Sequence, residues 1–150
     1  MAMLAWNPSW ETGVPEIDRQ HRMWLAQVEK LFQAIIGRQE PSAICEVLMF
    51  LASYVDSHFR LEERFMERSA YPGFAAHKAV HDELRSKVAS LIEAHNLDPA
   101  SLTDEITDFL SGWLIRHIDE HDRAMARHLK KACPKAPELM GEGANSSEMD

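Results

Sequence analysis

The feature that most constrains this chain is a helical repeat of apolar residues in four long segments. Within each segment apolar residues recur at positions i, i+3, i+4 and i+7, which places them on one face of an α-helix. The first segment runs from about Pro15 to Gly37, the second opens at Pro41 and ends before Tyr71, and residues 96–99 separate the third from the fourth. No alternating strand pattern competes with these helices.

Four amphipathic helices of about 20 to 30 residues with short connections bury their apolar faces most simply in a bundle. A chain of 150 residues, 45% of them hydrophobic, suits a single domain. We therefore predict an all-α, antiparallel up-and-down four-helix bundle with an N-terminal extended arm, in a domain of residues 1–133. Asp18 is a plausible cap for the first helix. Residues 134–150 are small and acidic with no apolar period, which predicts a disordered tail.

The acidic charge and the scarcity of cysteine exclude several functions. The chain has 16 basic and 24 acidic residues, a net charge of −8 and no dense basic run, which argues against a nucleic-acid partner. No apolar run reaches the roughly 18 residues of a membrane span, and no signal-peptide pattern opens the chain. Cys45 and Cys133 encode neither a disulfide framework nor a thiolate zinc site. We expect a cytoplasmic protein without membrane insertion.

The histidines are the candidate functional residues, because 8 of them are many for this length. Two polar pairs, His58 with Glu62 and His77 with His81, have i, i+4 spacing. The members of each pair therefore stack about 6 Å apart along one helix face. Each pair is in register with the apolar stripe of its own segment, and the first and fourth segments each add one histidine to their stripes. A bundle therefore directs one polar set into its core: His21, His58, Glu62, His77, His81 and His117.

A metal site is the simplest account of this inward polar set. A lone histidine on an apolar face is more often a hydrogen-bonded core residue than a metal ligand. Five histidines and a glutamate would instead need a neutral hydrogen-bond network in the middle of a small bundle, at a large desolvation cost. Imidazole and carboxylate without thiolate suit iron, zinc, copper or manganese, and a bridging carboxylate suits two metals together. Spacing alone does not distinguish these metals.

The order of these motifs resembles the hemerythrin family, and most closely its bacterial single-domain branch, over about residues 6–129. The family has an isolated histidine on the first helix, HxxxE on the second, HxxxH on the third and HxxxxD on the fourth. This chain matches each in turn, and the fourth motif adds Asp122 to the set. Flanking residues are also similar: Trp6, Thr12, Gly13 and residues 17–20 before the first histidine, and residues 113–118 around the last.

The resemblance implies two iron ions, Fe2+ or Fe3+, as the cofactor. One iron would be bound by His77, His81 and His117. The other would be bound by His21 and His58, with Glu62, Asp122 and an oxo or hydroxo group bridging the two. Dioxygen would bind to the iron held by only two histidines.

One implied ligand fits a regular helix poorly. Asp122 lies five residues after His117, about 140° around an α-helix, whereas His121 occupies the i+4 position. Following the family, we predict that a local π-type widening or side-chain length brings Asp122 to the irons. For His95, His121 and His128 we favour surface positions or positions beside the site.

The resemblance also implies a function, the reversible binding of dioxygen for storage or for delivery to an oxygen-requiring enzyme. Trp113, Leu114 and Ile118 match positions that line the oxygen pocket in the family. Five neutral imidazoles with only two carboxylates compensate little charge on high-valent iron, which disfavours oxygen activation. We therefore expect a monomeric carrier and not an enzyme, with weak oxidase or peroxidase activity at most.

Three other functions use residues of the same kind. A ferritin-like di-iron oxidase would use Glu-x-x-His pairs, and the chain has none. Residues 117–121 match the H-x-x-E-H motif of some metallopeptidases, but too little chain follows to build a third ligand and a substrate cleft. An oxygen or redox sensor, or an iron-handling protein, would use the same di-iron site and stays open.

Overall fold

The predicted all-α bundle is confirmed in a computed structural model, which describes residues 5–132. The chain order is a 3-10 turn (Pro8–Trp10), α1 (Pro15–Ile36), α2 (Pro41–Arg68), α3 (Phe74–Leu97), a 3-10 turn (Pro99–Ser101), α4 (Glu105–His117), a π-helix (Ile118–Asp122) and α5 (Arg123–Ala132). The predicted tail, residues 134–150, lies outside the described residues, so the domain boundary at 133 stays a prediction.

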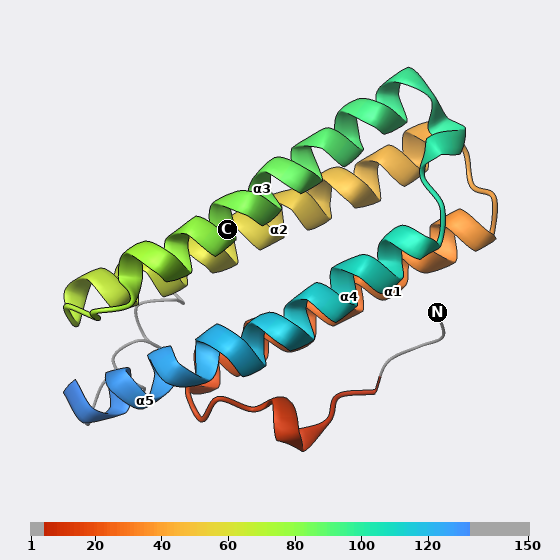
Figure 1. The fold of residues 1–150 in the computed structure, drawn as a ribbon. Helices are drawn as coiled ribbons and strands as arrows, with labels where there is room; N and C mark the ends of the chain where they lie inside the picture. The colour runs from red at the N-terminus through yellow and green to blue at the C-terminus, as the bar shows by residue number, and fades with distance from the viewer. Residues whose placement is uncertain (1–4, 133–150) are drawn as a thin grey trace.

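The four long helices run up and down with short connections between them (Figure 1). Helix α1 packs against α2 and α4, and α2 packs against α3. Helix α5 continues the line of α4 through the π-helix, so the two act as one long fourth helix. Every helix therefore faces the central axis along its whole length, as the apolar stripes require.

Proline opens α1 and α2, at the first helical position where its missing N–H has no helical partner to lose. The prediction that Asp18 caps α1 is wrong, because the cap position is Val14. Asp18 lies inside the first turn, and its carboxylate accepts hydrogen bonds from Thr12 N and Oγ1, both at 2.8 Å, and from Gly13 N at 3.1 Å. It therefore fastens the N-terminal arm to the helix.

Gly13 makes the turn that joins the arm to α1. Its φ of +88° is in the left-handed region, and a Cβ there would lie 2.0 Å from Lys130 Nζ. Lys130 Nζ donates to Thr12 O at 2.9 Å, and Arg123 donates to the backbone carbonyls of Ser9 and Glu11. These contacts hold the arm against α5, and the left-handed φ of Gly13 would be strained with any larger residue at the turn.

Two apolar clusters fill the bundle, one toward each end. The larger cluster includes Trp24, Val55 and Leu114, and the smaller includes Ile17 and Phe65. In α1, α2 and the fourth helix the sequence passes from one cluster to the other across residues that are polar and buried. A polar layer therefore lies between two apolar plugs.

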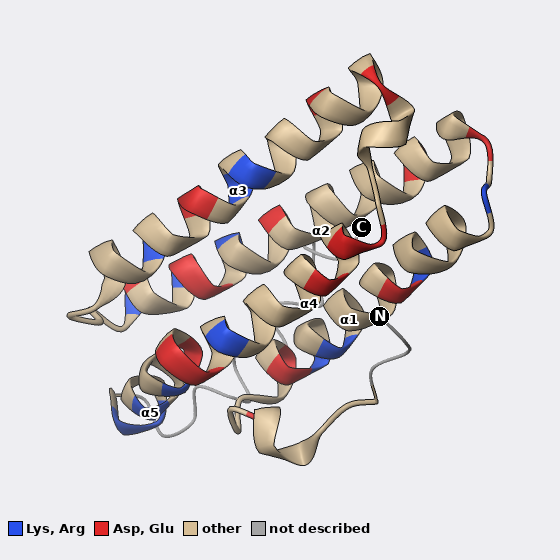
Figure 2. Ribbon diagram, turned by 45° about the vertical axis from the view of Figure 1, so that its right-hand side comes forward, with Lys and Arg blue, Asp and Glu red and all other residues tan. Residues whose placement is uncertain are grey.

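Most charged residues lie on the outer faces of the helices, and Glu16, Asp18, Glu62 and Asp122 are the acidic residues that are buried among those described. Acidic residues are spread over α1 to α4, and basic residues gather on α5 (Figure 2). Lys130 and Lys131 occupy the last turn of α5, where a helix favours positive charge. Among the described residues, no helix has the length and apolar character to span a membrane.

Candidate metal centre

Seven polar side chains converge in the layer between the two apolar clusters. All are at most 2% exposed and all come from different turns of four helices. Their ligand atoms form two groups, each within 4.8 Å, and two carboxylates belong to both groups. The seven are His21, His58, Glu62, His77, His81, His117 and Asp122.

The first group contains three imidazoles. His117 Nε2 lies 3.0 Å from His77 Nε2 and 3.1 Å from His81 Nε2. Asp122 Oδ1 lies 3.1 Å from His77 Nε2 and 3.2 Å from His117 Nε2. Glu62 Oε1 completes the group at 3.2 Å from His81 Nε2. Three nitrogens and two oxygens thus surround one point.

The second group contains two imidazoles and the other oxygen of each carboxylate. His21 Nε2 lies 3.1 Å from Asp122 Oδ2 and 3.5 Å from Glu62 Oε2. His58 Nε2 lies 2.9 Å from Glu62 Oε2. Each carboxylate therefore directs one oxygen to the first group and one to the second, which is the arrangement of a bridge between two metal ions.

Several of these candidate ligand atoms have no hydrogen-bond partner among the described residues, as expected of atoms that bind metal ions. Both oxygens of Glu62 and of Asp122, and Nε2 of His21 and His58, are buried without a properly directed hydrogen bond among the described residues. Unpaired buried polar atoms cost about 1 to 3 kcal/mol each, so they are rare unless a ligand satisfies them. Imidazole nitrogens with shared carboxylates are ligands that suit iron and similar ions.

The electrostatics of the site agree with a place for cations. Burial alone would lower the pKa of His21, His77 and His117, but contact with Asp122 and Glu62 outweighs burial and raises each pKa to about 9. Burial alone would raise the pKa of the Glu62 carboxyl, and the surrounding imidazoles hold it well below its ordinary value. Metal ions bound here would replace these protons, because a histidine that binds a metal must be deprotonated.

The π-helix decides which residue of the fourth helix enters the site. Residues 118–122 form it, which is one of the two alternatives that the sequence left open, and the wider turn places Asp122 on the same face as His117. Asp122 is fully buried, whereas His121 is partly exposed beside the site, with its ring centroid 5.2 Å from that of His117. The i+4 position of a regular helix would have been the wrong choice.

Aromatic rings support the ligand histidines from the side. Phe59 stacks on His81 with ring centroids 3.8 Å apart and planes at 7°. Trp113 stacks on His117 at 4.6 Å and on Trp24 at 5.7 Å. Rings packed in this way restrict the side-chain torsions of the ligands and keep their nitrogens aimed at the site.

The residues predicted to line an oxygen pocket differ in exposure. Leu114 and Ile118 are at most 1% exposed and belong to the larger apolar cluster, while Trp113 is partly exposed. Trp113 also lines a small surface pocket with His117 and His121. The structure thus puts two aliphatic side chains and one indole ring near the metal ligands, and their role in binding oxygen stays a prediction.

The sequence did not predict the residues that contact the outer ring nitrogen, Nδ1, of two candidate ligand histidines. His81 Nδ1 lies 2.8 Å from Glu63 Oε2, and His58 Nδ1 lies 2.7 Å from Gln20 Oε1. Gln20 and Glu63 each stand directly beside a candidate ligand in the sequence, which was the available signal. Their direction depends on how the helices pack, and spacing does not reveal it.

Two histidines outside the site tie helices together. The preference for a surface or near-site position is wrong for His95, which is 2% exposed near the end of α3 and far along that helix from the site. Its Nε2 lies 3.2 Å from Pro41 O. His128 Nε2 lies 2.9 Å from Ser69 O. Both satisfy carbonyl groups of α2 or its end.

The fold and the site define a class of protein, a four-helix bundle whose core holds a buried cluster of histidines and carboxylates that could bind metal ions. Residues 12–129 match the family model described as "Hemerythrin HHE cation binding domain". The chain belongs to the hemerythrin family, and the resemblance seen in the sequence is confirmed.

Curated relatives and solved structures of this family cover most of the chain. It is 35% identical over 130 residues to a bacteriohemerythrin of Stenotrophomonas maltophilia, covering 87% of this chain and 84% of that one. It is 35% identical over 125 residues to a bacteriohemerythrin of Methylococcus capsulatus, covering 82% and 94%. A crystal structure of wild-type hemerythrin superposes with a TM-score of 0.80 at 32% identity, covering 85% of this chain and 98% of that one.

Proposed function

We propose that this protein binds dioxygen reversibly at a di-iron site, for storage or for delivery to an oxygen-requiring enzyme. Family membership and the buried cluster of histidine, glutamate and aspartate support a di-iron, oxygen-binding fold. The observation that carries the proposal is the division of oxygens at Glu62 and Asp122, each of which faces both groups of imidazoles.

Two irons would supply the two electrons that dioxygen takes up on binding and returns on release. His77, His81 and His117 would hold one iron, and His21 and His58 the other. With three histidines in one group and two in the other, the iron held by His21 and His58 would have one protein ligand fewer, and dioxygen would bind there. The chain's contribution is to fix this difference and to keep water away from the site.

Two apolar residues of the fourth helix would also take part in this function. Leu114 and Ile118 are buried on the fourth helix, in the cluster that also contains Trp24. Apolar side chains there exclude water and protons, and this exclusion would keep bound oxygen from being lost as a reduced product. These residues would therefore lengthen the life of the oxygenated state without touching the chemistry of the metals.

The test is reconstitution with ferrous iron under argon, followed by cycles of air and argon. We expect two irons per chain and a visible absorption band that appears with air and disappears under argon over several cycles. A band that does not reverse, or iron that oxidises in one step, would contradict a carrier and favour an oxidase or a sensor. A monomeric state and a cytoplasmic location stay predictions, which sedimentation and cell fractionation measure.

A further inference from the structure

The five histidines among the candidate iron ligands differ in what their outer ring nitrogen, Nδ1, contacts. His58 Nδ1 donates to the neutral amide oxygen of Gln20. His81 Nδ1 donates to the carboxylate of Glu63 at 2.8 Å. Nδ1 of the other three histidines (His21, His77 and His117) is buried with no hydrogen-bond partner among residues 5–132. Within residues 5–132, only one of the five imidazoles therefore has an anionic partner at Nδ1.

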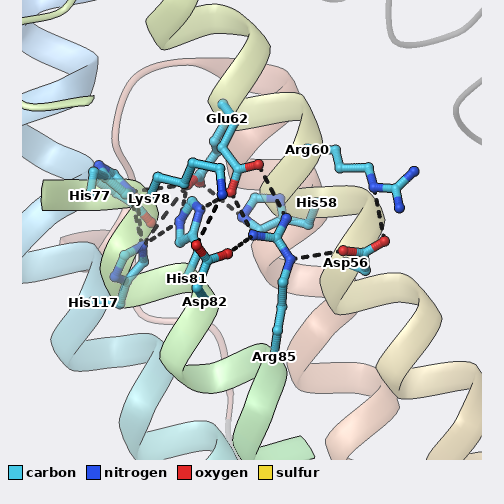
Figure 3. Close-up of polar contacts among 12 residues, drawn as sticks. Asp56, His58, Arg60, Glu62, His77, Lys78, His81, Asp82, Arg85 and His117 are labelled. Atoms are coloured by element: carbon cyan, nitrogen blue, oxygen red, sulfur yellow. Dashed lines mark hydrogen bonds and ion pairs between the residues drawn. The ribbon is translucent and has the colours of Figure 1, made fainter. Parts of the chain in front are cut away.

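Glu63 is held in place by a charged network between α2 and α3. Arg85 Nη1 donates to Glu63 Oε2 at 2.8 Å and Nη2 donates to Oε1 at 3.2 Å, a two-pronged contact. The same guanidinium donates to Asp56 at 2.8 Å and to Asp82 at 2.9 Å (Figure 3). The Glu63 side chain is only 13% exposed, so its two oxygens have a fixed direction.

The His81 ring itself is fixed on its face as well as at its edge. Phe59 stacks on it, and the Arg85 guanidinium lies over the Phe59 ring, 5.2 Å from the ring centroid. A carboxylate only accepts hydrogen bonds, so the proton of the His81 ring must be on Nδ1. Nε2 then presents its lone pair to the site.

We propose that Glu63, oriented by Arg85, is a positioning residue that fixes the Nδ1–H form of His81 and strengthens electron donation from His81 Nε2 to its iron. An anionic acceptor makes an imidazole a more basic ligand than a neutral acceptor does. A stronger donor stabilises ferric iron relative to ferrous iron. This inference rests on the proposed di-iron site, and it does not depend on whether oxygen binding is reversible.

The test compares Glu63→Gln with Glu67→Gln in the iron-loaded protein. Glutamine at 63 keeps the size and the acceptor but removes the charge. Glu67 is exposed one helical turn further on, so its variant changes the net charge equally away from the site. For Glu63→Gln we expect preference for ferric over ferrous iron to fall about tenfold, a potential about 59 mV more positive for one electron. Glu67→Gln should match the wild type.

Two further variants make the result specific. Glu63→Asp restores the charge and should recover part of the potential. Arg85→Lys keeps the positive charge but loses the two-pronged contact, so it should shift the potential in the same direction as Glu63→Gln and by less. It also tests the inference should Glu63→Gln not fold.

The outcomes separate this inference from the proposed function. Equal potentials in Glu63→Gln and Glu67→Gln, with two irons bound in each, would overturn the role of Glu63 alone. The expected shift together with irreversible reaction with air would support the role of Glu63 and overturn the carrier. A wild-type protein that binds no iron in a chelator competition would overturn both.

Discussion

At the scale of single residues, the site depends on which atom of each side chain points toward the two groups of ligand atoms. Asp122 and Glu62 each place two oxygens between two sets of imidazoles, and both side chains are buried away from the protein surface. Burying such groups is expensive unless a positive charge lies beside them, and protonated imidazoles or bound metal ions can supply that charge. A bridging carboxylate can therefore be tested separately from a histidine that only lies nearby.

The first prediction concerns Asp122 and its neighbour. Asp122→Ala should reduce bound iron below two per chain, because one oxygen is lost from each group. His121→Ala should keep two irons, since that ring lies beside the site and shares no metal group. Metal analysis after gel filtration measures both. The ligand assignment would be wrong if His121→Ala lost iron and Asp122→Ala kept it.

The second prediction concerns the wall of the oxygen site. Leu114→Ala should shorten the lifetime of the oxygenated form several-fold, because the cavity admits water. Leu110→Ala is the matched control, one turn earlier on α4 and equally buried. Both variants should lose about 2 to 5 kcal/mol of unfolding free energy. Stopped-flow absorbance measures the lifetime, and equal rates of autoxidation in the two variants would count against the pocket role.

At the scale of elements, the fourth helix carries the decisive irregularity. The π-helix of residues 118–122 adds one residue to a turn, so that Asp122 faces inward and the apolar face of α5 still meets the smaller cluster. The sequence also puts Met125 and Leu129 at i, i+4 spacing, both buried. The widened turn therefore directs Asp122 into the site and keeps the apolar residues of α5 facing the core.

The third prediction tests that register. Deleting Glu120, which is exposed, turns HxxxxD into HxxxD in a regular helix and should leave Asp122 and α5 facing inward. Inserting one alanine before Glu120 should rotate both by about 100° and abolish metal binding and much of the stability. Circular dichroism and metal analysis measure the pair. Loss of iron in both variants would show that the π-helix itself is required.

At the scale of the whole molecule, the two apolar clusters seal a polar layer that four helices share. The ligands come from α1, α2, α3 and the fourth helix, so the site forms only when all four have packed. Binding free energy is then folding free energy, because the unfolded chain has no such site. Metal and fold should stabilise each other.

The fourth prediction follows from this coupling. Ferrous iron at about a thousand times its dissociation constant should stabilise the fold by about 4 kcal/mol. This gain should raise Tm by on the order of 10 °C for a domain of this size. Anaerobic thermal melts with iron and with a chelator measure the difference. Asp122→Ala is the control and should show a smaller rise, while equal melting temperatures with and without iron in the wild type would contradict the coupling.

The sequence by itself determined the four helices and most of the metal site. Apolar periodicity predicts the helices because each must bury one face, and the i, i+4 pairs at His58 and His77 share those faces. The order of the motifs identified the family and, through it, Asp122. Which face of a helix is buried depends on the spacing of apolar residues within that helix, so the sequence alone can predict it.

Only the tertiary structure decided the contacts that join different helices. These include the division of the Glu62 and Asp122 oxygens between two groups, the burial of His95, the anchoring role of Asp18 and the contact of Glu63 with His81. Each depends on the rotation and depth of one helix against another, to within about a hydrogen-bond length. Apolar periodicity predicts which face of a helix points inward. It does not predict which atoms of the neighbouring helices the side chains on that face contact.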